Sequence, residues 1–264
     1  MPRTRWLLLA TVVAQACTGA AQAPAPVASS VPVPTDSIDF SASEGWRAQQ
    51  LVVVTTPAWD SISGTMQRFT RLRSSSKWRA DGAPVRVVVG RTGLAWGADS
   101  LGRGGRGPRK REGDGRAPAG MFPLDTAFGF APATAVSWVR LPYVELRDGT
   151  ECVDDSASAH YNTVVERGAV PAVDWSSAEQ MRHIEQYRLG VIVGYNAAPI
   201  RRGRGSCIFL HIWAGPTTPT AGCTAFPAAE VESLVRWLDP RLRPMLVQLP
   251  SAEYVRLRER WQLP

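Results

Sequence analysis

The stretch that decides the fold lies at positions 206–213 and reads Ser-Cys-Ile-Phe-Leu-His-Ile-Trp. Side chains alternate between the two faces of a β-strand, so one face carries Cys207, Phe209, His211 and Trp213. The opposite face carries only isoleucine and leucine between these positions. Both faces are largely apolar, which indicates a central strand buried on both sides of a β-sheet.

Other short runs of β-branched residues predict further strands around this one. The runs at 50–56 and 85–89 are each followed by Pro or Gly, which is typical of strand ends. Positions 63–69 and 191–195 are also strand-like. No internal repeat is visible in the chain, so we expect one mainly β domain with a few short helices.

Two helices are predicted. The first begins at the capping-box pattern Ser-Ser-Ala-Glu at 176–179, with Trp175 placed to pack on its first turn, and runs to about Tyr187. The second lies between Pro227 and Pro240. Its apolar residues recur with helical spacing, at Val231, Leu234, Val235 and Leu238.

The N-terminus is typical of a secretory signal peptide over residues 1–23. Arg3 and Arg5 precede an apolar run at 6–13, and small residues follow. We therefore expect export across the inner membrane to the periplasm or cell envelope. Cys17 raises the alternative of a lipoprotein, and only its lipidation would anchor the protein to a membrane. The residues before Cys17 match the usual lipidation box poorly.

The remaining chain divides into three expected parts. Residues 24–49 are rich in Pro and Ala and predict an extended linker. Residues 50–250 form the predicted catalytic domain, and residues 251–264 a C-terminal tail. Within the domain, residues 101–120 are rich in Gly, Arg and Pro and predict a solvated loop with a positive tip.

The charge of the chain suits an anionic partner. The formal net charge is +7, and the excess of arginine is compatible with binding to nucleic acid or to an anionic polymer of the cell envelope. Export removes the protein from most nucleic acid, so we expect no nucleic-acid partner and favour the envelope polymer. Solubility alone is the competing explanation.

Cysteine count points to one special thiol. With Cys17 in the leader, three cysteines remain, at positions 152, 207 and 223. An odd number in an oxidising compartment implies one disulfide and one free thiol. The count alone does not say which cysteine is free.

The context of Cys223 favours a nucleophile. Gly222 lets the backbone take unusual dihedral angles next to it, and free N–H groups at such a turn can receive the oxyanion of a tetrahedral intermediate. A helix starting a few residues later would favour the thiolate. His211 ends the buried strand and can serve as the base. The alternative is a core histidine whose ring is satisfied by a carbonyl.

The run at 208–213 together with Pro-Thr-Ala-Gly-Cys at 219–223 resembles the L,D-transpeptidase catalytic domain of the YkuD/ErfK family. Further motifs of that family's envelope-associated branch recur in order along roughly residues 50 to 250. They are positions 89–97, 112–120, 153–155, 161–162 and 194–196.

The resemblance implies a β-sandwich domain that acts on peptidoglycan stem peptides without a cofactor. Cys223 would attack the carbonyl of the third stem residue and release the terminal D-Ala, and His211 would carry the proton. An amine acceptor then gives a 3→3 cross-link. The alternatives are an L,D-carboxypeptidase, in which water is the acceptor, and a non-catalytic envelope-binding protein.

The chain departs from the commoner family motif at two positions. Ala221 replaces a second histidine, and Ala225 stands where an arginine is usual. The interval between His211 and Cys223 is also shorter than usual. We therefore expect a cation from the basic loop, Arg109 or Arg116, to take the place of the missing arginine.

With Cys223 as the nucleophile, Cys152 and Cys207 remain as the expected disulfide. The competing arrangement is a zinc site built from Cys207, His211 and Cys223. The spacing of Cys207 and His211 on a strand puts their side chains about 13 Å apart, which is too far for one tetrahedral metal ion. We therefore expect no metal.

Four residues are further candidates for substrate binding: Thr220, Trp213, Tyr195 and Asn196. Trp213 shares the face of His211, and Tyr195 and Asn196 belong to one of the family-like motifs. Tyr-Asn and Asp-Asp pairs are also common turn formers, so a structural role is the alternative for Tyr195 and Asn196, and for the pairs at 154–155 and 161–162.

Overall fold

The structure is a computed structural model that describes residues 47–73, 76–98 and 106–264. The predicted signal peptide, Cys17 and most of the predicted linker lie outside the described residues. Strands predominate in the described part of the chain, so the prediction of a mainly β fold is confirmed. The strands are β1 (Gln50–Thr56), β2 (Ser63–Thr70), β3 (Arg79–Val88), β4 (Leu94–Trp96), β5 (Ala117–Gly129), β6 (Tyr143–Glu145), β7 (Thr150–Val153), β8 (Val164–Glu166), β9 (Ala178–Gln180), β10 (Leu189–Val193), β11 (Phe209–Ile212), β12 (Thr224–Phe226) and β13 (Met245–Pro250).

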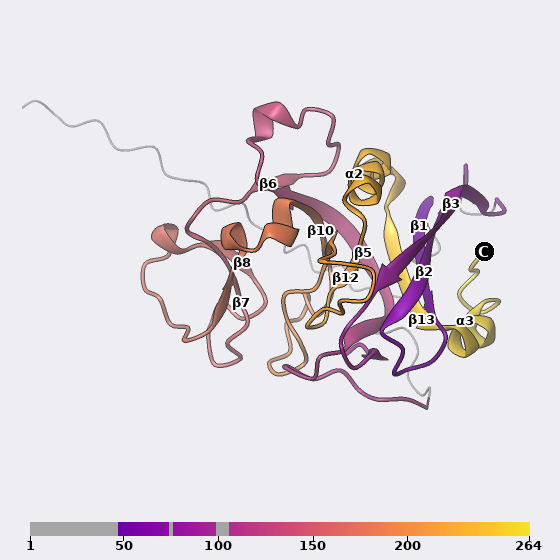
Figure 1. Cartoon of the computed structure of the whole chain (residues 1–264), viewed down its shortest axis with the longest axis horizontal. Coiled ribbons are helices and arrows are strands. Elements are labelled where there is room, and N and C mark those ends of the chain that lie inside the picture. The colour runs from indigo at the N-terminus through magenta and orange to yellow at the C-terminus, as the bar shows by residue number, and fades with distance from the viewer. Residues whose placement is uncertain (1–46, 74–75, 99–105) are drawn as a thin grey trace, which may run out of the picture.

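The large sheet closes on itself. Its strands are hydrogen-bonded in the order β10-β11-β12-β3-β2-β1-β13-β5-β4, and β10 also pairs with β5. The 13-residue β5 makes this closure possible, because its first half pairs with β13 and its second half with β10. The strands therefore surround one apolar interior as a closed barrel (Figure 1). The predicted β-sandwich is not confirmed.

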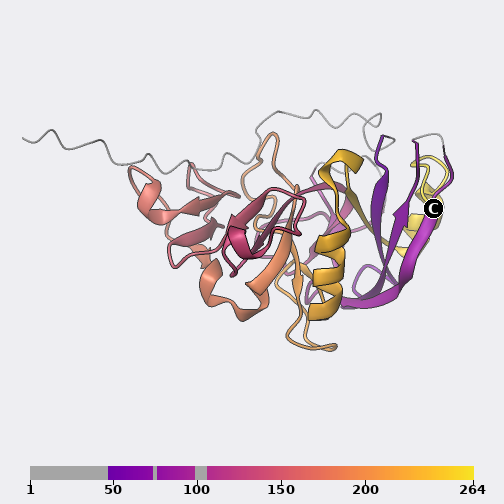
Figure 2. The ribbon, with the colours of Figure 1, turned by 90° about the horizontal axis from the view of Figure 1, so that it is seen from above.

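Helices cover the outside of this sheet. The α-helices are α2 (Ala228–Trp237) and α3 (Ser251–Leu257), and the 3-10 turns are η1 (Ala133–Ala135), η2 (Arg167–Ala169), η3 (Met181–His183), η4 (Glu185–Arg188) and η5 (Pro240–Leu242). The predicted helix after Pro227 is confirmed as α2. It buries Val231, Leu234 and Val235 and lies along the barrel wall (Figure 2).

The predicted helix at 176–187 is wrong. This segment forms β9 followed by the turns η3 and η4. The residues of the expected capping box bond to other parts of the chain: Ser176 binds Asp155, and the Ser177 hydroxyl donates to Asp154. These side chains are therefore not available to cap a helix, and the pairing of β9 with β7 keeps the backbone extended.

A second, three-stranded sheet lies beside the barrel. Its order is β8-β7-β9 (Figure 1). A disulfide between Cys152 on β7 and Cys207, two residues before β11, joins it to the barrel. The predicted Cys152–Cys207 pairing is therefore confirmed. This disulfide places the small sheet next to the start of β11.

Two segments predicted as a loop and a tail contain regular secondary structure. The basic loop ends at Arg116, because Ala117–Gly120 already belong to β5 and are buried. The segment 251–264, expected as a tail, contains α3 and contributes Trp261 and Leu263 to the core. The strand predicted at 206–213 is shorter, because β11 spans Phe209–Ile212 and Cys207 has a positive φ of 54°. Ile208, Leu210 and Ile212 belong to the main core, while Cys207 and Phe209 pack with Cys223 in a second cluster.

Candidate active site

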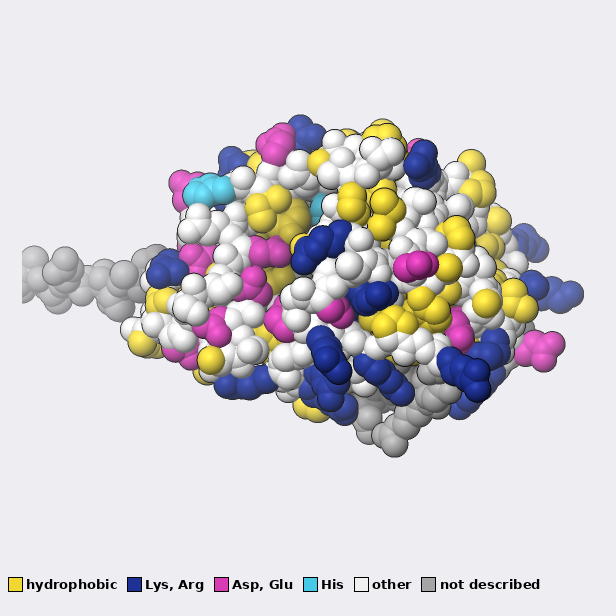
Figure 3. Space-filling model, turned by 60° about the horizontal axis from the view of Figure 1, so that its bottom comes forward, with side chains coloured by type: hydrophobic (Ala, Val, Ile, Leu, Met, Phe, Trp, Pro, Cys, Tyr) yellow, Lys and Arg dark blue, Asp and Glu magenta, His cyan; other side chains and the backbone are white. Residues whose placement is uncertain are grey.

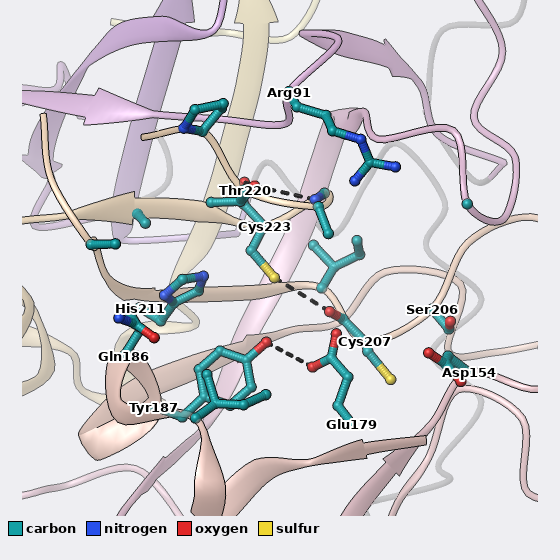
Figure 4. A pocket seen from close by; sticks show the side chains of 18 of the residues that line it. Arg91, Asp154, Glu179, Gln186, Tyr187, Ser206, Cys207, His211, Thr220 and Cys223 are labelled. Atoms are coloured by element: carbon teal, nitrogen blue, oxygen red, sulfur yellow. Dashed lines mark hydrogen bonds between the residues drawn. The ribbon is translucent and has the colours of Figure 1, made fainter. Parts of the chain in front are cut away.

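A pocket of about 330 Å³ opens where β11, the segment before β12, the turn η4 and the small sheet meet. Cys223, His211, Tyr187 and Glu179 lie together in it (Figure 4). The space-filling view shows the hollowed face, with acidic side chains on one side of the hollow and Lys or Arg on the other (Figure 3). The pocket therefore combines a thiol, an imidazole and side chains of both charges.

Cys223 lies on the floor of this pocket. It is 5% exposed, and among the described cysteines it is the one outside the disulfide. Its Sγ accepts the Phe209 N–H at 3.3 Å and donates to the Cys207 carbonyl at 3.4 Å. Burial raises the pKa of the thiol, and the charge of Glu179 raises this pKa further. The thiol is therefore protonated in the free protein.

The helix expected to favour the thiolate does not begin at the thiol. The strand β12 follows Cys223 directly, and α2 begins only at Ala228. The cause is the pairing of β12 with both β11 and β3, which extends the chain here. The backbone N–H of Phe209, rather than a helix terminus, supplies the hydrogen bond that lowers the pKa of the thiol.

His211 is held as a neutral base. Its Nδ1 lies 2.8 Å from the Ile212 carbonyl, and because a carbonyl only accepts, Nδ1 carries the proton. The lone pair is then on Nε2. Burial lowers the pKa of His211 to about 4, so the ring is uncharged near neutral pH. In Figure 4 the ring lies beside the Cys223 sulfur.

Hydrogen bonds fix the loop that presents the thiol. Thr220 donates through Oγ1 to the Cys223 carbonyl at 2.6 Å and accepts the Gly222 N–H at 3.1 Å. The Thr220 backbone bonds in turn to Val89 and Arg91. Thr220 lines the pocket as predicted, but through this loop geometry. The Gly222 N–H already has a partner, so its predicted oxyanion role requires that this bond open.

Two residues of the site were missed by the sequence reasoning. The Tyr187 hydroxyl donates to Glu179 Oε2 at 2.7 Å, and its ring packs edge-on against His211 at 5.1 Å. Burial raises the pKa of Glu179 to about 7, the bond from Tyr187 opposes the rise, and the charges of Asp154 and Glu112 add to it. No sequence signal marked Glu179, because Ser-Ser-Ala-Glu fits a capping box equally well.

The cations of the pocket are Arg91 and Lys110 rather than the predicted Arg109 or Arg116. Arg116 donates from Nη1 to the Leu94 and Trp59 carbonyls, at 2.9 and 3.2 Å, which fixes it to the barrel backbone. Lys110 is buried and paired with Asp114 at 2.6 Å. Arg91 is exposed at the rim and belongs to the family-like motif at 89–97.

Three candidate substrate-binding residues lie outside the pocket lining. The Tyr195 hydroxyl donates to the Arg204 carbonyl, and Asn196 bonds to Arg201 and Gly205. These bonds brace the loop at 197–205. Trp213 is half-buried, and its backbone N–H donates to the Phe226 carbonyl at 3.0 Å.

The Tyr-Asn pair at 161–162 has a similar structural role next to the site. The Asn162 side chain accepts the Cys207 N–H at 3.0 Å and donates to the Tyr195 and Asn196 carbonyls. The Tyr161 hydroxyl donates to Glu112. These motif residues therefore hold Cys207, whose carbonyl accepts the hydrogen bond from the Cys223 thiol.

The zinc alternative is excluded by the bonding of Cys207. Its sulfur is joined to Cys152, so it is not available as a metal ligand. Across residues 47–73, 76–98 and 106–264, no group of three or more His, Cys, Asp or Glu is arranged to hold a metal ion. In the same part of the chain no helix has the length and apolarity that a bilayer crossing requires.

Comparisons with known proteins add no family to this description. No protein-family model, curated protein or solved structure matches the chain.

Proposed function

We propose that this protein is an exported, cysteine-dependent L,D-transpeptidase of peptidoglycan. One observation carries the proposal: the free thiol of Cys223 lies on the floor of a pocket beside a neutral His211 whose Nε2 is left to accept a proton. A thiol paired with such a base is the arrangement that nucleophilic acyl transfer needs. The resemblance of residues 208–223 to the family supports the choice of substrate.

The reaction has two balanced halves. The Cys223 sulfur attacks the carbonyl carbon of the third stem residue, the C–N bond to the terminal D-Ala breaks, and D-Ala leaves as an amine after gaining the thiol's proton. A thioester results. An incoming amine then attacks this thioester, gives up a proton and releases the thiol, which forms the 3→3 cross-link. His211 accepts the proton of the incoming amine in the second half.

The proposal includes what the family resemblance implies for the whole molecule. The mature protein would act in the periplasm or cell envelope, with peptidoglycan stem peptides as partners and no nucleic acid. The closed sheet would correspond to the L,D-transpeptidase-type β-sandwich. The exposed Arg91 would bind the carboxylate of the terminal D-Ala, the role of the arginine that Ala225 replaces.

Mass spectrometry of muropeptides tests the proposal. Purified protein incubated with sacculi rich in tetrapeptide stems is expected to produce 3→3 dimers, and C223A is expected to produce none. T217A is the matched control, because Thr217 is exposed on the same loop outside the pocket lining. A carbapenem should add covalently to the wild type and to T217A but not to C223A.

Two results would contradict transfer and identify the alternatives. Tripeptide stems without dimers would make the protein an L,D-carboxypeptidase on the same site. An unchanged muropeptide profile with sacculus binding that C223A retains would make it a non-catalytic envelope-binding protein.

A further inference from the structure

The thiol of Cys223 contacts a second proton-accepting group besides His211. The Tyr187 hydroxyl interacts with the Cys223 sulfur and donates to Glu179 Oε2 at 2.7 Å (Figure 4). Tyr187 is 5% exposed, and its ring is fixed by edge-on packing against Phe209 at 5.4 Å and His211 at 5.1 Å. The hydroxyl therefore has one geometry, between a sulfur and a carboxylate.

We propose that, when the thiol of Cys223 is activated, its proton turns from the Cys207 carbonyl to the Tyr187 oxygen and leaves through Tyr187 to Glu179. His211 stays neutral until it accepts the proton of the incoming amine. The sulfur–hydrogen bond breaks as the Tyr187 oxygen takes that proton, and the Tyr187 proton passes to a Glu179 carboxylate oxygen. The products are a thiolate and a neutral carboxylic acid, which gives this proton back when D-Ala leaves as an amine. This inference rests on the proposed function only in taking Cys223 as the nucleophile.

Charge balance favours this route over transfer to His211. Passing the proton to the imidazole would create two new charges in a buried site, which is costly without further hydrogen bonds. Passing it to Glu179 moves one existing negative charge from oxygen to sulfur. The pKa values agree with this preference: burial lowers the pKa of His211 to about 4 and raises that of Glu179 to about 7.

The groups around Glu179 favour a carboxyl that holds a proton. Asp154, at the end of the small sheet, and Glu112, from the basic loop, both place negative charge near it and raise its pKa, against the bond from Tyr187. Lys110 acts on the sulfur instead, where its charge lowers the pKa of the thiol. The charges of Asp154 and Glu112 therefore favour a protonated Glu179, and the charge of Lys110 favours the Cys223 thiolate.

The test is the rate at which iodoacetamide alkylates Cys223 as a function of pH, read by peptide mass mapping. This readout needs no peptidoglycan, so it separates the relay from the proposed function. In the wild type the rate should rise as Glu179 ionises near neutral pH. E179Q and Y187F should lose that rise and react about a hundredfold more slowly above it, because general-base assistance is removed.

Two further variants, D154N and H211Q, test whether Glu179 or His211 is the group whose ionisation produces the rise in rate. D154N removes one of the charges that raise the pKa of Glu179, so the rise should move to lower pH and keep its height. H211Q should keep the rise at its wild-type position. E185Q is the matched control, since Glu185 is an exposed carboxylate near Tyr187.

Opposite outcomes would overturn the relay. If E179Q reacts as fast as the wild type or faster, Glu179 only repels the thiolate. If H211Q alone abolishes the rise, the imidazole is the thiol's base. Should E179Q fail to fold, the D154N shift still decides, because an unmoved rise excludes Glu179 as the titrating group.

Discussion

Single side chains decide what the pocket can bind. Of the arginines considered, Arg91 is the one whose side chain lines the pocket, while Arg116 is tied to backbone carbonyls. An exposed guanidinium that pairs with a substrate carboxylate contributes to binding and little to the chemical step.

R91A is therefore expected to raise KM about tenfold, the cost of one hydrogen bond to a charged group, and to leave kcat nearly unchanged. Steady-state release of D-Ala from a tetrapeptide stem measures both constants. R109A is the matched control, because Arg109 is exposed and does not line the pocket. Equal KM values for R91A and R109A would refute the role of Arg91.

At the scale of elements, the small sheet and the barrel meet at the site, and the disulfide joins them. Cys152 lies on β7, and the carbonyl of Cys207 accepts the hydrogen bond from the Cys223 thiol. The two cysteines are 55 positions apart, so the cross-link removes a large loop's freedom from the unfolded chain.

Replacing both residues, C152A/C207A, should lower the free energy of unfolding by roughly 4 kcal/mol in the chain-entropy account. Urea unfolding of the double variant against the unreduced wild type measures the loss, and reduced wild type should fall to a similar value. Equal midpoints for oxidised and reduced wild type would contradict a stabilising cross-link.

The C-terminal segment is a second element whose contribution can be measured. Trp261 is 5% exposed in the main core, whereas Val255 on α3 is 73% exposed. W261A should cost about 3–5 kcal/mol in unfolding free energy, because a large cavity remains. V255A should cost almost nothing. Similar losses for the two variants would mean that α3 and its neighbours do not pack as described.

The elements also show what local sequence can predict. Strands β1, β2 and β11 and helix α2 were predictable because apolar spacing follows the faces they bury. The segment 176–187 was not, because its serines bond to the aspartates at 154–155, which are distant in sequence, and Glu179 accepts from Tyr187, whose turn η4 forms only with the fold. Cys223 and His211 could be found from their motifs, while the Tyr187–Glu179 pair arises only when these elements assemble.

For the whole molecule, the site makes two opposing contributions to the pH dependence of stability. Burial raises the pKa of Glu179 from 4.5 to about 7, so between these values the folded state binds a proton that the unfolded state has released. Stability falls as pH rises through that window. Burial lowers the pKa of His211 from 6.5 to about 4, so stability rises with pH between 4 and 6.5.

Removing one group should expose the contribution of the other. Relative to the wild type, E179Q should gain stability progressively from pH 4.5 to 7, and H211Q should gain most at low pH, each by about 3 kcal/mol. Urea unfolding across this range gives both difference curves, with E185Q as the control that should stay flat. Because the two curves must slope in opposite directions, parallel curves would show that Glu179 and His211 are not buried with these shifted pKa values.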